Sequence, residues 1–218
     1  RGWFEKNNVR IGDKVLDIWL FMNDEVFVFD NIINLNYQTR IKELLVGEGT
    51  FNNLCLPWYF TLDITHSEEL EGQGRCAFVH NFAHPDEGII SSFHPLFLKL
   101  IKNSCKKIKV EKVNILQGKT LFELPKSKVL NIPDDPHINF HEKHFSMIYY
   151  VSDSDGDTII YNEKEKSKSY TIKERVSPKQ GRVVLFDGAL FHTDEEPKEG
   201  RRCIVRYDLV DLSVDSHI

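Results

Sequence analysis

The chain has 218 residues, 41% of them hydrophobic, which is enough to bury a core within a single domain spanning residues 1–218. Its formal net charge of -5 disfavours nucleic-acid binding through bulk positive charge. No apolar run approaches the length of a membrane span and no signal segment opens the chain, so we expect no membrane association and a cytoplasmic location. The four cysteines form no C-x-x-C pair and suit buried thiols in a reducing compartment.

Residues 1–109 predict a mixed scaffold of helices and strands. Asn34 is a candidate N-cap for a helix that continues to Leu45 and ends at Gly47. A second amphipathic helix is expected over residues 95–108, with lysines on its solvated face. Strands are expected at residues 15–29 with a turn at 23–25, at 57–62 as a buried strand, and at 75–82, with a loop at 66–74.

From residue 110 onward the pattern changes to closely spaced short strands. They are expected at residues 110–116, 120–130, 147–151, 158–161, 170–176, 183–186 and 203–209. Residues 152–157 are rich in turn formers and predict a hairpin connection. Early helices followed by many strands favour an α+β protein with an antiparallel β core, built as a sandwich or a barrel.

Two stretches of the second half carry residues suited to a metal site. On a strand, His137 and Asn139 would present their side chains on the same face. The distant His192 could complete a three-ligand facial site that leaves metal positions open, and an arginine after it could hold a carboxylate. On the expected strand at residues 203–209, Arg206 and Asp208 are expected to form a surface pair.

The order of motifs over the last 90 or so residues resembles a known superfamily. The pieces are His137-x-Asn139, Tyr149-Tyr150, residues 155–158, residues 178–181 followed by Phe186, His192, and Arg201-Arg202. This series resembles the iron(II)- and 2-oxoglutarate-dependent dioxygenases, in particular the prolyl-4-hydroxylase-like branch and its small phage- and bacterial-type members. The resemblance implies a double-stranded β-helix, or jelly-roll, core over residues 110–212, with flanking N-terminal helices.

The resemblance also implies an activity and its cofactors. Such an enzyme binds iron(II) and 2-oxoglutarate, uses O2, and hydroxylates a C–H bond of a peptide or small molecule while producing succinate and CO2. Iron would be held by His137, Asn139 and His192. The 2-oxoglutarate carboxylate would be held by Arg202 or alternatively Arg201, with Tyr150 as a hydrogen-bond donor and Asn114 lining the pocket.

One residue departs from the pattern of that superfamily. Asn139 stands where the carboxylate ligand is found, and an amide dipole neutralises a divalent cation less well than a full charge. Asn139 could still ligate through its oxygen, Asp135 could replace the carboxylate, or the position could be open to water or a halide, as in halogenating relatives. The remaining alternative is an impaired or non-catalytic jelly-roll binding module.

Overall fold

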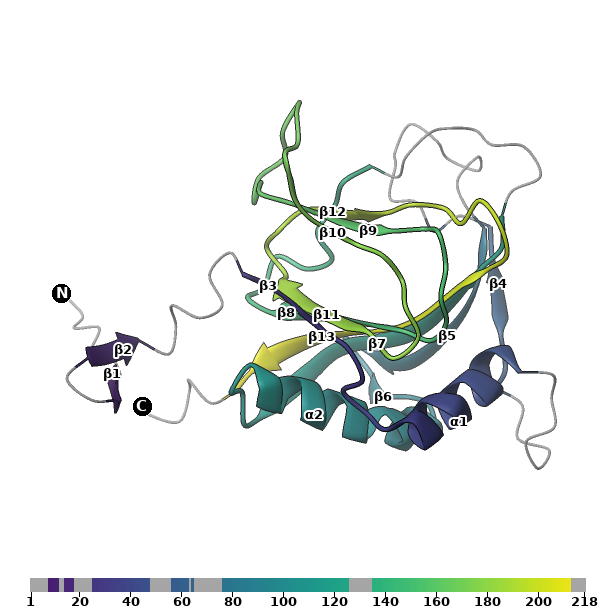
Figure 1. Cartoon of the computed structure of the whole chain (residues 1–218), viewed down its shortest axis with the longest axis horizontal. Helices are drawn as coiled ribbons and strands as arrows, with labels where there is room; N and C mark the ends of the chain where they lie inside the picture. Colours follow the sequence, from purple (N-terminus) through teal and green to yellow (C-terminus); the bar gives the residue numbers. More distant parts are fainter. Residues whose placement is uncertain are drawn as a thin grey trace.

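The computed structural model describes residues 25–47, 56–62, 64, 76–125 and 135–212, together with the backbone of residues 8–11 and 14–17. The described elements form three layers, with the helices α1 and α2 on one face of a large antiparallel sheet and a small sheet on the other (Figure 1). The expected α+β class is therefore confirmed. Among these residues, no helix is both long enough and apolar enough to cross a bilayer.

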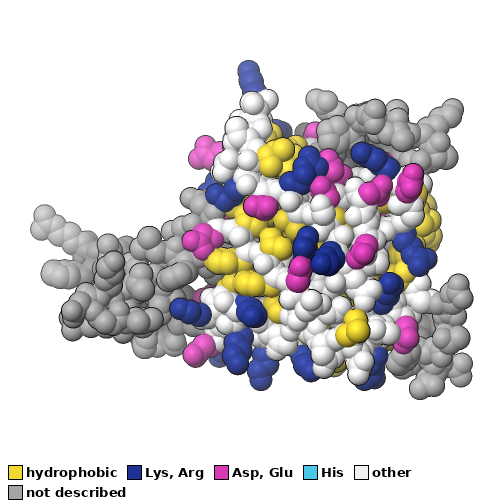
Figure 2. Space-filling model, in the orientation of Figure 1, with side chains coloured by type: hydrophobic (Ala, Val, Ile, Leu, Met, Phe, Trp, Pro, Cys, Tyr) yellow, Lys and Arg dark blue, Asp and Glu magenta, His cyan; other side chains and the backbone are white. Residues whose placement is uncertain are grey.

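Both expected helices form. Helix α1 spans Leu35–Val46, the side chain of Asn34 accepts a hydrogen bond from the backbone nitrogen of Tyr37 at 3.0 Å, and Gly47 is its C-cap. A 3-10 turn, η3 (His94–Phe97), leads into α2 (Leu98–Lys107). The lysines of α2 are exposed, and dark blue side chains follow the lower edge of Figure 2, where Figure 1 places this helix.

The large sheet has the strand order β3-β11-β8-β13-β7-β5-β4, with β6 paired to β5. Its strands are β3 (Val26–Phe29), β4 (Tyr59–Thr61), β5 (Ala77–His84), β6 (Gly88–Ile89), β7 (Val113–Glu123), β8 (Phe145–Tyr150), β11 (Val183–Asp187) and β13 (Arg202–Asp211). The small sheet has the order β10-β9-β12, with β9 (Thr158–Tyr161), β10 (Ile172–Val176) and β12 (His192–Asp194). Strands β1 (Asn8–Ile11) and β2 (Lys14–Asp17) form a separate antiparallel pair.

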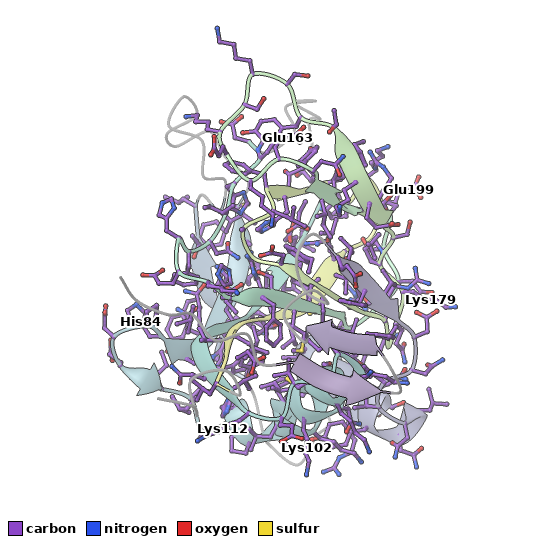
Figure 3. The ribbon with its side chains drawn as sticks, turned by 90° about the vertical axis from the view of Figure 1, so that its left-hand side faces the viewer. His84, Lys102, Lys112, Glu163, Lys179 and Glu199 are labelled. Carbon is purple, nitrogen blue, oxygen red and sulfur yellow. The ribbon has the colours of Figure 1, made fainter. Side chains whose placement is uncertain are left out.

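Alternation along the central strands divides the core into two clusters. Tyr149 and Val205 belong to the cluster that the helices cover, whereas their neighbours Tyr150 and Ile204 belong to the cluster between the two sheets. Successive side chains of a strand point to opposite faces, so every second residue of β13 faces the space between the sheets. Figure 3 shows this layering from the side, with Glu163 beyond the small sheet and Lys102 of α2 at the opposite end.

The structure differs from several sequence-based expectations. The stretch at 57–62 is an exposed edge and not a buried strand, since Tyr59 is 64% and Phe60 58% exposed. The predicted strand at 110–116 and the beginning of the one at 120–130 merge into the single strand β7, and residues 126–130 lie outside the described residues. Neither β6 nor β12 was expected. Cys105 and Cys203 are buried thiols, but Cys76 is exposed. The expected loop at 66–74, Cys55, and the turn residues 23–24 lie outside the described residues.

Candidate functional site

The structure brings the two predicted histidines together. The backbones of His137 and His192 form an antiparallel bridge, with an N–O distance of 3.0 Å in each direction. The centroids of their imidazole rings are 4.7 Å apart. Since His192 is fully buried while His137 is only half-buried, the pair lies at the inner edge of the space between the sheets.

Both imidazoles are oriented by backbone carbonyls. Nδ1 of His137 lies 3.1 Å from the carbonyl oxygen of Asp135, and Nδ1 of His192 lies 3.3 Å from that of Leu190. A carbonyl only accepts, so each Nδ1 carries a proton. Since Arg206 Nη2 can only donate, the nearby His192 Nε2 presents its lone pair, and this ring is neutral. Burial, together with the charges of His137 and Arg206, holds the pKa of His192 well below its usual value, which favours this neutral form.

The side chain at position 139 is held by a buried carboxylate. Asp208 Oδ1 accepts hydrogen bonds from Asn139 Nδ2 at 3.1 Å and from Ser146 Oγ at 2.6 Å. It also lies 3.8 Å from His144 Nε2, and neither of these two side chains is exposed. Because a carboxylate can only accept, the nitrogen of the Asn139 amide must face Asp208, and its oxygen is the atom left for any other partner.

Arg206 occupies the face of His192 that a metal would need. Its Nη2 lies 3.1 Å from His192 Nε2, and its Nε lies 3.6 Å from Asp208 Oδ2. Arg206 is 6% exposed and Asp208 fully buried, so the expectation of a surface pair is wrong. These residues share the inward face of β13 with Ile204, which places the pair between the sheets.

Arg202 is committed to partners within the protein. Its Nη1 donates to Glu123 at 2.7 Å, its Nη2 to Asp194 at 2.5 Å and Thr158 at 2.9 Å, and its Nε to the carbonyl of Gly156 at 3.1 Å. The guanidinium is fully buried. Although burial disfavours the charge, the carboxylates of Asp194 and Glu123 raise the pKa of Arg202.

The remaining predicted residues lie in different surroundings. Tyr150 is fully buried in the cluster between the sheets, and burial raises its pKa against the opposing effects of Arg202 and of a hydrogen bond with Thr158. Arg201 and Asn114 are exposed, and Asn114 pairs with Val210 at the other end of β13 from Arg202. Asp135 is exposed and contacts His137 through its backbone oxygen.

Solved structures share this fold. A 2OG-Fe(II) oxygenase from Burkholderia pseudomallei matches with a TM-score of 0.60 and 12% identity, over 85% of each chain. A prolyl hydroxylase from Trichoplax adhaerens, solved with a hypoxia inducible factor peptide, matches at 0.53 and 11% over 89% of this chain and 87% of its own. HygX from Streptomyces hygroscopicus, solved with nickel and 2-oxoglutarate, matches at 0.51 and 12% over 90% and 86%.

These similarities identify the fold as the jelly roll of the 2-oxoglutarate- and iron(II)-dependent oxygenases, including prolyl hydroxylases, so the resemblance noted in the sequence is confirmed at that level. Neither a protein-family model nor a curated protein sequence matches the chain. At 11–12% sequence identity, these similarities establish a shared fold but not a shared activity or ligand.

The side chains at the centre do not fit iron(II) in the arrangement that the resemblance implies. Two adjacent imidazoles suit a metal, but within the described residues no group of three His, Cys, Asp or Glu side chains could hold one. The nearby carboxylate of Asp208 is already shared by Asn139, Ser146 and Arg206. The guanidinium of Arg206, which is permanently charged, contacts His192 Nε2.

Reasoning from the sequence did not predict a role for Glu123, or for Lys119, which lies opposite Arg206 on β7. It named Arg206 and Asp208 but placed them on the surface. A usable signal was present on the last strand, where Arg202, Ile204, Arg206 and Asp208 alternate with Cys203, Val205, Tyr207 and Leu209. Both sets are buried, because the strand lies between the helices and the small sheet. The polar set faces the small sheet.

Proposed function

We propose that this chain is a small-molecule binding module built on the oxygenase fold, in which a fixed guanidinium takes the place of the metal. The observation that carries the proposal is the 3.1 Å contact between Arg206 Nη2 and His192 Nε2. Arginine stays charged at any physiological pH, so this nitrogen lone pair is permanently engaged by a cation. A divalent ion at the same place would have to displace a buried guanidinium from both His192 and Asp208.

The charge of the centre supports the same conclusion. A metal ligand set with a carboxylate offsets part of the charge of the ion, whereas Asn139 offers only an amide dipole. Asp208 supplies one negative charge, which faces the positive charge of Arg206 at 3.6 Å. Lys119 adds a second cationic side chain on the neighbouring strand, opposite Arg206. A centre with two cationic side chains suits a small anionic ligand better than a metal cation.

A second candidate is the iron(II)- and 2-oxoglutarate-dependent hydroxylase that the resemblance implies, acting on a peptide or small molecule. Two observations favour it. Both imidazoles are oriented by backbone carbonyls at Nδ1, and the Asn139 oxygen points away from Asp208. In this candidate Asn139 is the weak third ligand of the metal.

Metal titration separates the two candidates. We expect calorimetry with manganese(II), with and without 2-oxoglutarate, to show no binding to the native chain and no iron(II)-dependent formation of succinate. A variant that combines Asn139→Asp with Arg206→Gln restores a carboxylate and removes the competing cation, and should bind manganese(II) with an affinity that calorimetry detects. Arg175→Gln, at an exposed ion pair with Glu195, is the matched control for loss of an arginine.

The contrary result is equally specific. If the native chain forms succinate in an iron(II)-dependent reaction that His192→Ala abolishes and Arg175→Gln leaves intact, the binding-module proposal is wrong. The second candidate would then stand, and Arg206 would have to leave His192 when the metal enters.

A further inference from the structure

Lys119 lies at the boundary between the interior and solvent. On β7 it is opposite Arg206 of β13 on one side and opposite Asn81 of β5 on the other. Directly opposed residues of antiparallel strands project from the same face of the sheet. Arg206 is buried, Lys119 is half-buried and Asn81 is exposed. Lys119 therefore lies between the buried arginine and the exposed edge of this face.

The backbone around Lys119 is irregular on both neighbouring strands. The pairing with β5 shifts register between Asn81 and Ala83, and the pairing with β13 shifts between Asp208 and Leu209. Bulges re-aim the side chains beside them and are common next to functional sites. The preceding residue, Gly118, allows the ring of Tyr207 to lie against the strand, because a Cβ there would overlap that ring.

The Lys119 amine has a lowered pKa and no partner within the described ranges. Among the residues the structure describes, no hydrogen bond or ion pair reaches its Nζ. Burial, and then the positive charge of Arg206, lower its pKa to about 8, against the opposing effect of Asp208 and Asp194. Roughly a tenth of such an amine is neutral at pH 7, compared with well under a thousandth for an ordinary lysine. A neutral amine in a partly dry site is a nucleophile.

We propose that Lys119 forms a reversible Schiff base with a small carbonyl compound that carries a carboxylate, and that Arg206 binds the carboxylate. The neutral amine adds to the carbonyl carbon, and proton transfer from nitrogen to oxygen gives a carbinolamine. Loss of water then leaves a carbon–nitrogen double bond, so one amine and one carbonyl yield one imine and one water. The step needs no oxidant or reductant, and hydrolysis reverses it.

The carboxylate is assigned to Arg206 because the other buried arginine is already saturated. All three nitrogen atoms of Arg202 donate to groups of the protein. Arg206 uses Nη2 on His192, while its buried Nε lies 3.6 Å from Asp208 Oδ2 and makes no hydrogen bond in the described region. A carboxylate gains a strong charge-assisted hydrogen bond from such a guanidinium. Arg206 lies directly opposite Lys119 on the neighbouring strand. The carboxylate and the carbonyl group can therefore belong to one short molecule.

Borohydride trapping tests the proposal on the full-length protein, with EDTA present so that the outcome is independent of any metal. Incubation with pyruvate and sodium borohydride reduces the imine to a stable secondary amine, which peptide mass spectrometry locates. We expect one adduct, on Lys119, and its loss in Lys119→Arg. Lys102→Arg, on the exposed face of α2, is the matched control and should leave the yield unchanged.

Two further arms examine the roles of the amine and the guanidinium. Acetone, which has the same carbonyl without the carboxylate, should label Lys119 at least about tenfold more slowly than pyruvate, and Arg206→Gln should remove that difference. Labelling spread equally over exposed lysines, or concentrated on Lys143, would overturn the assignment of Lys119. Equal rates for pyruvate and acetone in the native chain would overturn the assignment of Arg206. Neither result bears on metal binding, which the titration above measures separately.

Discussion

Replacing Arg202 by methionine distinguishes a structural arginine from a ligand-binding one. Arg202 on β13 ties together both sheets, since it contacts Glu123 of β7, Thr158 of β9 and Asp194 of β12. Methionine preserves much of the buried volume but removes every donor. The carboxylate of Glu123, whose side chain is only 2% exposed, would be left without its cation.

The expected cost follows from this burial. Removing one partner of a buried ion pair costs about 3–5 kcal/mol, because an uncompensated charge stays in the interior. Glu123→Gln, which keeps the shape and leaves Asp194 in place, should cost less, about 1.5–3 kcal/mol. The control is Arg175→Met, whose partner Glu195 lies in an exposed pair, and it should cost less than about 1 kcal/mol. Urea denaturation followed by circular dichroism gives the three free energies of unfolding.

The opposite pattern would refute this assignment of Arg202. If Arg202→Met unfolds within 1 kcal/mol of the native chain and instead abolishes binding of 2-oxoglutarate, the guanidinium serves the ligand, as the resemblance implies. Glu123 and Asp194 would then only hold it in place. If Arg202→Met loses stability as expected and the native chain binds no 2-oxoglutarate, the structural role is supported.

Two other variants test packing and protonation. Gly188→Ala would place a Cβ inside the ring of His144, so we expect a loss of about 1–3 kcal/mol in unfolding free energy, and the combination with His144→Ala should cost less than the sum of the two changes. Burial lowers the pKa of His94, whose Nδ1 lies 3.0 Å from the Tyr207 hydroxyl. The unfolded chain binds the proton more readily, so stability should decline as the pH falls below 6.5, and His94→Gln should make the decline shallower in urea titrations at pH 7.5 and 5.5.

Local signals accounted for the elements whose formation depends on their own residues. The Asn34 cap and the Gly47 stop define α1, and the strand at 158–161 was placed at its observed bounds, since turn formers and β-branched residues act over a few positions. The misplaced element shows the limit of such signals. The aromatic run at 57–62 has the composition of a buried strand, but it lies at the open edge of the sheet, and strand order is not a local property.

The candidate site divides in the same way. Motif order was sufficient to pair His137 with His192 and to raise Asn139 as the weak point of a metal centre. The partner of each polar side chain was not predictable, because Glu123 lies 79 residues from Arg202 in the chain and Asn139 lies 69 from Asp208. Strand register decides which charged side chains lie close together inside a protein. A shift of one residue would move each side chain to the other face of the sheet.

The sequence alone determined both helices, most of the strands, the fold class and the two imidazoles, because periodicity, caps and spaced motifs are properties of neighbouring residues. Only the tertiary structure decided that carboxylates engage Arg202, that Arg206 contacts His192 Nε2, and that Lys119 lies opposite Arg206 on the neighbouring strand. The physical reason is that a buried charge must be matched by whatever group the fold brings within reach, and sheet pairing sets that group.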